Sequence, residues 1–438
     1  MTLGLCLAIF CCGIQILHLV IQSTVCLILL KVLHGRTMAV CVFVVSLLYL
    51  SVFQIHRAYI KGLTDLIDVS GPMMIMTQKI SSLAFNLYDG KYRASSQLTD
   101  IQKKNPIREM PSALQYYSYL FHFHGIIVGP MCFYSDYISF VEGTELVKHQ
   151  KKIEASGITH YAVKQRPSPV GTVSQKLLTA GFWLLVHLTF TPHFPVTNNS
   201  DAVFIRDHGW IYRLLFMLAS MILARAKFYI SWTLADAVNN ASGFGFNGYD
   251  EKGKPRWDLI TNIKILKLEF AMSTKTFIEN WNIQTTVWLR LVCYDRVPVL
   301  KTLLTFMLSG LWHGFYPGYY FTFLFGTFCT AAGRKVHRNI RPLFLEPEKK
   351  KLVYDIVTWF CTQLTIAYLA VPFTILYTQT TLDFYNSFYW CFHIAVISIS
   401  LVIPNLPRKS AENTSEVTKS LKISGVHVRE KDIIGKTY

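Results

Sequence analysis

The chain has 438 residues, of which 52% are hydrophobic and only 16% are charged. This composition excludes an ordinary soluble domain and indicates a polytopic membrane protein. The formal net charge of +17 does not indicate nucleic-acid binding, because the basic residues lie in short loops between hydrophobic tracts. In that position the positive-inside bias and anionic lipid headgroups explain them.

Several tracts without Asp, Glu, Lys or Arg are long enough to cross a bilayer, which takes about 20 apolar residues. These tracts are 3–30, 37–56, 112–135, 177–200, 302–333, 356–382 and 384–407. Two shorter stretches with polar interruptions, 71–86 and 214–234, predict further membrane-embedded helices. We therefore expect an all-α bundle of about eight to eleven transmembrane or re-entrant helices.

The first tract predicts a membrane anchor rather than a cleaved signal peptide. No basic region precedes it, and Lys31 and Arg36 follow it where a cleavage site would be needed. Its polar residues, among them Gln15, His18 and Gln22, must face protein, so the tract is either one tilted helix or two short ones.

The composition predicts one membrane-embedded domain over residues 1–407. Residues 408–438 are polar and unevenly charged, which predicts a disordered tail. Nearly all of the ten cysteines lie in apolar tracts without a CxxC pair, so neither a disulfide framework nor a metal site is indicated.

Carboxylates and a lysine accompany apolar positions between Asp68 and Gly90. This pattern predicts an interior or interfacial helix. The alternative is an ordinary bundle helix from which Lys79 extends its ammonium group to the membrane surface.

In two regions that contain arginine, the sequence does not decide what the basic side chains bind. In 214–234, Arg225 and Lys227 interrupt an apolar run, and a cation at that depth needs either an acidic partner or a substrate phosphate. The loop 147–176 is rich in lysine and is either a solvated face or a docking surface for the phosphates of coenzyme A.

A GxGxxG pattern at Gly243, Gly245 and Gly248 does not indicate dinucleotide binding. That reading requires a preceding strand and a following helix, whereas here a membrane segment precedes and a charged turn follows.

The most informative stretch runs from Trp281 to Tyr320 and contains Asn282 and His313, which are 31 positions apart (313 − 282). His313 lies inside an uncharged tract and is followed by Gly314 and by a Pro317–Gly318 break, so we expect the helix to bend there. A lone histidine on an apolar helix can be structural, but small residues flanked by aromatic rings favour a lined cavity. Burial disfavours the imidazolium, and a neutral ring can take a proton from a hydroxyl. The carboxamide of Asn282 can orient that hydroxyl or donate to an oxyanion.

Two separated motifs then agree in order and spacing with a known family. Trp281–Asn282 with Trp288, followed by Leu311-Trp312-His313-Gly314 and Pro317-Gly318-Tyr319, resembles the membrane-bound O-acyltransferase (MBOAT) family. The Trp-His-Gly-x-x-Pro-Gly-Tyr form resembles its lysophospholipid acyltransferase branch, whose members often carry a further helix upstream of the first tract.

The resemblance implies an MBOAT-type bundle around a central chamber, with His313 and Asn282 as the catalytic pair. It also implies that further residues line the chamber in which acyl-CoA and the lysolipid bind. Those from 247 to 258 would lie on a re-entrant segment near the tunnel for the acyl donor. The chamber residues are Trp281, Trp288, Trp312, Gly314, Tyr319, Asn247, Tyr249, Trp257 and Asp258.

In function, the resemblance implies an enzyme of the endoplasmic-reticulum membrane that uses acyl-CoA as co-substrate, without a cofactor or metal. The acceptor would be a lysophospholipid, with lysophosphatidylethanolamine or lysophosphatidylserine favoured and oleoyl as the preferred acyl group. The sequence leaves the oligomeric state open. The alternatives are acylation of a protein or a sterol, and a lipid transporter or scramblase without chemistry.

Overall fold

The computed structural model describes the chain except for residues 62–68, 128, 148–165, 251 and 405–438. The predicted tail and most of the lysine-rich loop lie outside the described residues. Within the described ranges the chain is all-α, without strands, and its one β-bridge pairs Tyr249 with Pro255. The prediction of an all-α polytopic membrane protein is confirmed.

The helices fall into three groups along the chain. The first comprises α1 (Thr2–Cys12), α2 (Ile16–Val32), α3 (Gly35–His56), α4 (Ser70–Tyr92), α5 (Asp100–Lys104), α6 (Ala113–Leu120) and α7 (Tyr134–Val141). The second comprises α9 (Val170–Phe190), α10 (Ala202–Asp207), α11 (Trp210–Ala241), α12 (Ile265–Glu269), α13 (Thr274–Asn280) and α14 (Ile283–Leu289). The third comprises α15 (Lys301–His313), α16 (Pro317–Asn339), α17 (Glu348–Ile375), α18 (Thr378–Ser387) and α19 (Cys391–Val402).

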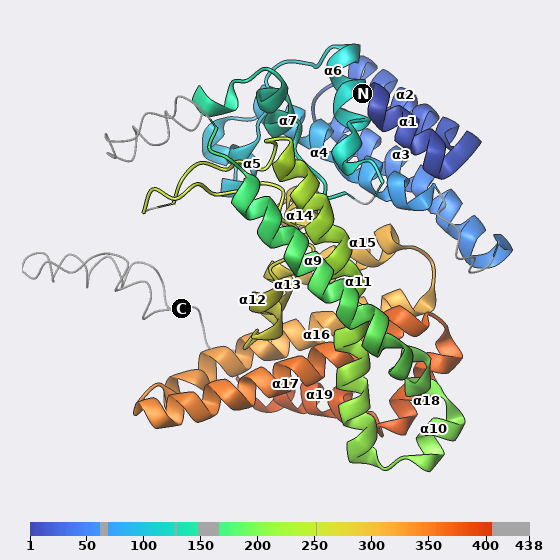
Figure 1. Ribbon diagram of the computed structural model, residues 1–438, viewed down its shortest axis with the longest axis vertical. Coiled ribbons are helices and arrows are strands. Elements are labelled where there is room, and N and C mark those ends of the chain that lie inside the picture. Colours follow the sequence, from blue (N-terminus) through green and yellow to red (C-terminus); the bar gives the residue numbers. More distant parts are fainter. Residues whose placement is uncertain (62–68, 128, 148–165, 251, 405–438) are drawn as a thin grey trace, which may run out of the picture.

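These groups occupy different parts of the molecule (Figure 1). Helices α1 to α7 gather at the upper end, and α16, α17 and α19 lie across the lower end. The long helices α9 and α11 pack against each other and run between the two ends. One buried cluster joins α1–α7 to α14 and α15, and a second joins α11 to α16–α19. The break after His313 therefore lies between these two clusters, and a third cluster, of α11, α12, α13 and α17, packs against Trp281 beside Asn282.

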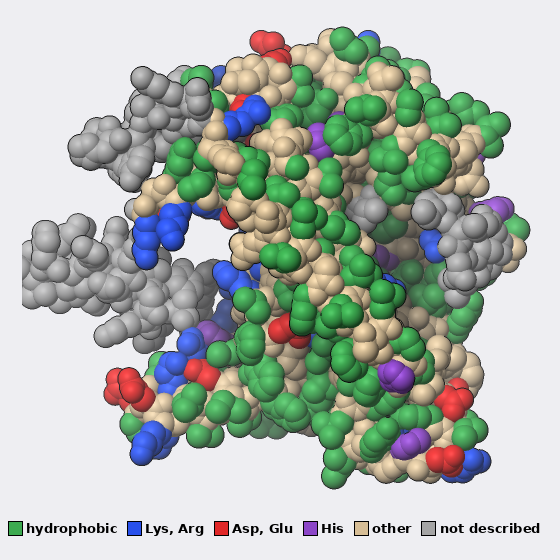
Figure 2. All heavy atoms as spheres, viewed as in Figure 1, with side chains coloured by type: hydrophobic (Ala, Val, Ile, Leu, Met, Phe, Trp, Pro, Cys, Tyr) green, Lys and Arg blue, Asp and Glu red, His purple; other side chains and the backbone are tan. Residues whose placement is uncertain are grey.

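Four helical segments among the described residues are long and apolar enough to cross a membrane: Thr2–Val32, Gly35–Ile60, Trp210–Ala241 and Glu348–Ile375. The pair α18 and α19, bent by 76°, adds a fifth if both belong to one crossing. Figure 2 shows hydrophobic side chains over much of the visible surface, as expected of helices that face lipid. The first segment is interrupted at Gly13, which fits the expected alternative of two short helices.

Some of the predicted spans were wrong. Residues 112–135 form only the short helix α6, a turn and the start of α7, because Gly129–Pro130 and further turns interrupt the apolar tract. Residues 302–333 form two helices instead of one. The tract 177–200 contains only part of α9, which ends at Phe190. Conversely, α11 is a full candidate span and is longer than the predicted 214–234.

Helix α4 is the interior helix that the pattern between Asp68 and Gly90 predicts. Lys79 does not reach the membrane surface: it is buried, and its Nζ donates to the carbonyls of Tyr119 and Leu120, each at 3.2 Å. Asp89 is also buried and accepts two hydrogen bonds from Arg296 at 3.1 and 2.6 Å. These contacts tie α4 to α6 and to the segment that leads into α15.

The open question about Arg225 is also resolved. Its Nη2 donates to both carboxylate oxygens of Glu269, at 3.0 and 2.8 Å, and its Nε donates to the hydroxyl of Tyr229 at 3.0 Å. Tyr229 in turn donates to Glu269. The partner of this cation is therefore an acidic side chain of the protein.

Candidate active site

The candidate site begins at the break between α15 and α16. His313 is the last residue of α15, and Gly314 follows with φ 133° and ψ −162°, a conformation that only glycine adopts readily. Pro317 then starts α16, at the position where its missing N–H costs nothing. The next residue, Gly318, lies so close to α17 that a Cβ would overlap the carbonyl of Pro372. The predicted bend is thus a complete break in the helix.

Aromatic rings surround the imidazole of His313. The ring centroids of Trp312, Phe373, Phe323 and Tyr319 lie 4.7, 4.9, 5.4 and 5.7 Å from its own. Among the residues that the structure describes, no group makes a hydrogen bond or ion pair with either ring nitrogen. The side chain is only partly buried. The ring is therefore held by packing alone, and its nitrogens remain available to a substrate.

Asn282 precedes α14 and has a left-handed backbone conformation, with φ 46° and ψ 54°. Asparagine tolerates this conformation better than most residues. The Nδ2 of Asn262 donates to the Oδ1 of Asn282 at 3.0 Å, while the Oδ1 of Asn262 accepts from the amide of Gln284 at 3.0 Å. The carbonyl of Asn262 also accepts from the amide of Ile283 at 2.8 Å. No described residue accepts a hydrogen bond from the Nδ2 of Asn282, so its two N–H groups are free to donate.

Helix α4 connects the two motif segments. The Nε1 of Trp288 in α14 donates to Ser81 at 2.9 Å, and the Nε1 of Trp312 in α15 donates to the carbonyl of Met74 at 3.1 Å. The two indole rings lie 5.7 Å apart. The structure thus brings Trp288 and Trp312 together in the core, although no hydrogen bond within the described ranges joins Asn282 to His313.

The loop after α11 holds four of the predicted chamber residues, Asn247, Tyr249, Trp257 and Asp258. Asn247 donates from its Nδ2 to Asp258 at 2.8 Å, and Tyr249 lies in the β-bridge opposite Pro255. Trp257 is buried. Burial raises the pKa of Asp258, but hydrogen bonds from Asn247 and Arg256 outweigh this effect and hold the pKa below its usual value.

This loop reaches Asn282 only at its far end. There Asn262 holds the Asn282 carboxamide, and the Nε2 of Gln284 donates to the carbonyl of Leu259 at 3.1 Å. The carbonyl of Trp257 accepts from Lys176 of α9 and Asn240 of α11, and the rings of Tyr249 and Trp257 pack on Phe246, so the described contacts do not bring the four residues to His313. Their assignment to the substrate chamber stays a prediction.

Comparison with known proteins decides the family. The sequence profile of MBOAT, the membrane-bound O-acyltransferase family, matches residues 57–371. Membrane-bound glycerophospholipid O-acyltransferase 2 of Rattus norvegicus is 46% identical over 415 residues, which are 94% of this chain and 80% of the relative. The chain belongs to the membrane-bound O-acyltransferase family.

Two further relatives support the same assignment. Membrane-bound glycerophospholipid O-acyltransferase 1 of Mus musculus is 41% identical over 422 residues, which are 95% of this chain and 85% of the relative. Lysophospholipid acyltransferase 6 of Drosophila melanogaster is 36% identical over 427 residues, which are 97% of this chain and 59% of that longer relative. This MBOAT chain is therefore an acyltransferase and a multi-pass membrane protein.

Sequence reasoning missed one residue at the MBOAT motif. The Nε2 of Gln54, at the end of α3, donates to the carbonyl of Trp312 at 2.6 Å. A carbonyl can only accept, so this contact fixes the orientation of the amide and leaves the buried Oε1 of Gln54 without a partner among the described residues. The only signal in the sequence was a glutamine inside an otherwise apolar tract.

Trp281 lies beside the MBOAT site rather than against His313. Its ring packs edge-on against Trp232 and Phe228, at 5.2 and 5.4 Å, and stacks on Phe277 at 6.1 Å. This aromatic cluster fixes the end of α13 and thereby the start of the Asn282 turn.

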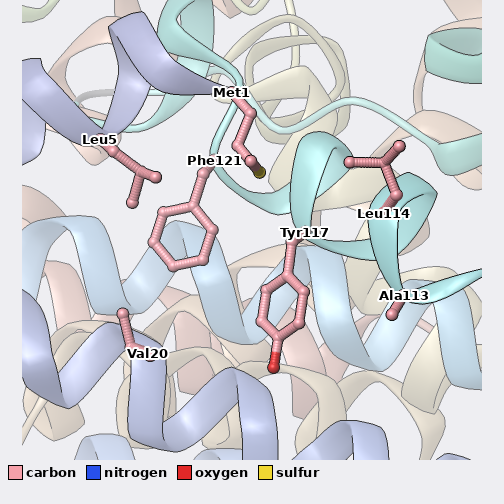
Figure 3. A pocket seen from close by; sticks show the side chains of 7 residues that line it. All are labelled: Met1, Leu5, Val20, Ala113, Leu114, Tyr117 and Phe121. Carbon is pink, nitrogen blue, oxygen red and sulfur yellow. The ribbon is translucent and has the colours of Figure 1, made fainter.

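A separate cavity of about 430 Å³ lies at the upper end of the molecule, between α1, α2 and α6 (Figure 3). Its lining is apolar apart from the hydroxyl of Tyr117, which forms a hydrogen bond with the hydroxyl of Thr24 at 2.8 Å. It therefore offers no group for acyl transfer. The lining residues are Met1, Leu5, Val20, Ala113, Leu114, Tyr117 and Phe121.

Proposed function

We propose that this chain transfers a fatty acyl group from acyl-CoA to the free hydroxyl of a lysophospholipid. The observation that carries the proposal is that two motif groups have no hydrogen-bond partner among the described residues: the ring nitrogens of His313 at the helix break, and the Nδ2 of Asn282 at the start of α14. The names of the relatives, which specify glycerophospholipid and lysophospholipid acylation, support the choice of acceptor.

The proposed reaction is a direct transfer. A neutral His313 takes the proton from the lysophospholipid hydroxyl while its oxygen attacks the thioester carbon of acyl-CoA. The carbonyl oxygen becomes an oxyanion, and the Nδ2 of Asn282 donates a hydrogen bond to it. The carbon–sulfur bond then breaks, the thiolate of coenzyme A leaves, and the imidazolium returns its proton to that sulfur. The ester, free coenzyme A and neutral His313 result.

Asn262 supports the assigned role of Asn282. The Nδ2 of Asn262 donates to the Oδ1 of Asn282, and this hydrogen bond fixes the orientation of the Asn282 carboxamide. The Nδ2 of Asn282 then remains available as a donor. An oxyanion requires donors, so this orientation favours oxyanion stabilisation over acceptance of the substrate hydroxyl. The aromatic rings around His313 give the reacting atoms an apolar environment.

The finer features of the proposal rest on the resemblance of the motifs. They are lysophosphatidylethanolamine or lysophosphatidylserine as acceptor, oleoyl as the favoured acyl group and the endoplasmic-reticulum membrane as the location. Acylation of a protein or a sterol is the alternative within the same chemistry, and a panel of acceptors separates these possibilities.

The test measures transfer of labelled oleate from its CoA ester to a panel of lysophospholipids, a sterol and an acylatable peptide. Membranes would contain the wild-type chain, His313→Ala, or the control His34→Ala, which changes an exposed histidine at the start of α3. We expect one or two lysophospholipids to be acylated by the wild type and the control, and His313→Ala to lose about 10³-fold in rate. Equal rates for wild type and His313→Ala would refute the general base, and lipid movement that survives the substitution would indicate a transporter.

A further inference from the structure

A second polar feature lies at the start of α11, on elements other than those that hold His313. Arg213, in the first turns of this 32-residue helix, is only 9% exposed. Its Nε and Nη1 are buried without a hydrogen-bond partner. A guanidinium cannot lose its charge in a protein, so an unpaired buried one is costly.

The acidic residues on the neighbouring described elements already have other partners. Asp201 caps α10 by accepting from the amide of Phe204 at 2.7 Å, and Asp207 pairs with Arg206 at 2.8 Å. Asp383 in α18 accepts from Gln379 at 2.9 Å. Helix α11 has no acidic residue in its first turn. Within the described part of the chain, Arg213 therefore has no ion pair.

The N-terminus of α11 adds a partial positive charge to the unpaired charge of Arg213. Gly209, the residue before α11, provides no side-chain cap, and no described group accepts from the amides of Trp210, Ile211 or Tyr212. Free amides at a helix N-terminus carry a partial positive charge and bind anions. A cation nearby is unfavourable there unless an anion compensates both.

Aromatic contacts bring Arg213 and the first residue of α11 to the same ring. Arg213 lies over the ring of Phe388, 5.6 Å from its centroid, and the ring of Trp210 packs on the same Phe388 at 6.1 Å. Phe388 belongs to the break between α18 and α19, where Tyr389 and Trp390 have left-handed backbones. The site is thus formed by the N-terminus of α11 and a break in the chain that packs against it. Figure 1 shows α10, α18 and the start of α11 together at the lower end.

The start of α11 and the break between α18 and α19 also place the site at the membrane surface. Helix α11 is a candidate span, and α18 with α19 forms the bent candidate span. Trp210, Tyr212 and Tyr389 are exposed at these ends, and such aromatic side chains are typical of the depth at which lipid headgroups lie. The anion present at that depth is the phosphate of a phospholipid.

We propose that Arg213 and the first amides of α11 bind the phosphate of a resident membrane phospholipid. The Nη2 of Arg213, which is not fully buried, can donate to a phosphate oxygen, and the amides supply further donors. The lipid chains would lie along the apolar surface of α11, while the phosphate would compensate the unpaired charge. This lipid is not the acceptor substrate, and its binding does not depend on the proposed reaction.

The experiment uses the full chain, purified in detergent and stripped of lipid, with unfolding followed by tryptophan fluorescence. The variant is Arg213→Gln, and the matched control is Arg206→Gln, an exposed arginine of α10 paired with Asp207. Phosphatidylglycerol is added as the probe. Diacylglycerol provides the chains without the phosphate, and inorganic phosphate provides the anion without the chains.

We expect phosphatidylglycerol to raise the unfolding temperature of the wild type and of Arg206→Gln, and to raise that of Arg213→Gln by roughly half as much or less. Arg213→Lys, which keeps the charge without the planar edge, should give an intermediate shift and provides a second variant if the first does not fold. Equal shifts in wild type and Arg213→Gln would overturn the proposal. So would a full shift with diacylglycerol, which would indicate chain binding alone, or with inorganic phosphate, which would indicate a free-anion site.

Discussion

Two polar regions of this molecule differ in how far their groups are paired. Around Arg225, the guanidinium, the Glu269 carboxylate and the Tyr229 hydroxyl all bond to one another. In the two motif segments, the ring nitrogens of His313 and the Nδ2 of Asn282 have no partner among the described residues. This difference distinguishes polar groups that stabilise the fold from polar groups that are available to a substrate. A polar group that only supports the fold is satisfied within the fold, whereas a group that acts on a substrate is held in place but left unpaired.

The largest expected effect comes from breaking the paired region. Glu269→Gln removes the charge opposite Arg225, and an unpaired buried guanidinium should cost about 3 kcal/mol or more of unfolding free energy. The measurement is the unfolding midpoint of the purified chain in detergent. Glu279→Gln is the control, because its pair with Lys275 is exposed on α13 and should contribute less than about 0.5 kcal/mol. Equal losses in the two variants would contradict the comparison.

Substitutions of the unpaired groups should lower activity rather than stability. Asn282→Asp keeps the acceptor for Asn262 and tolerates the left-handed backbone, but it removes the Nδ2 that we propose as the donor to the oxyanion. We expect kcat to fall by about 10²–10³-fold with an unchanged unfolding temperature. Asn280→Asp makes the same chemical change on α13, where the amide bonds only to the carbonyl of Thr276, and should leave kcat near the wild-type value. A loss of stability without loss of kcat would assign Asn282 to the fold.

Gly314 tests whether the break itself must keep its shape. Gly314→Ala forces a Cβ into a backbone conformation at φ 133° and places it near Gln54 and Tyr319. The strain should cost about 1–3 kcal/mol and should also lower kcat, since His313 is the adjacent residue. Gly171→Ala, at an unstrained helix position with open space, is the control. An unchanged rate in Gly314→Ala would mean that the turn is not needed to orient the imidazole.

The smallest effect is expected one contact further out, at Asn262. Asn262→Ala removes the bond that orients Asn282 and should lower kcat by about tenfold at similar KM. Asn262→Asp should lower kcat further, because its carboxylate accepts from Asn282 and turns the donor away from the substrate. The reverse order of the two variants would show that Asn262 matters only for packing.

The sequence predicted some of these features and missed others for physical reasons. His313 is a candidate because a titratable group at membrane depth is rare, whereas Asn282 is assigned to it through the resemblance of the motifs, and the bend after His313 follows from Gly314 and Pro317. An uncharged tract, however, does not distinguish one continuous helix from two, so it predicts a single span over residues 302–333 where the structure has α15 and α16. The partner of Arg225 is Glu269, 44 positions away (269 − 225), and such pairing depends on tertiary structure. The roles of Gln54 and Asn262 likewise exist only once distant segments meet.

The close contact between Gly318 and α17 has a consequence for how the protein is made. The amide of Gly318 donates to the carbonyl of Leu376 at 2.7 Å, and Phe373 of the same helix packs on His313. Leu376 is translated 58 residues after Gly318 (376 − 318). The whole signature from Trp281 to Tyr319 is therefore synthesised before the helix that closes it. A nascent chain that stops before α17 would contain every residue of the motif and still lack one wall of the site, so the site is completed late in biosynthesis.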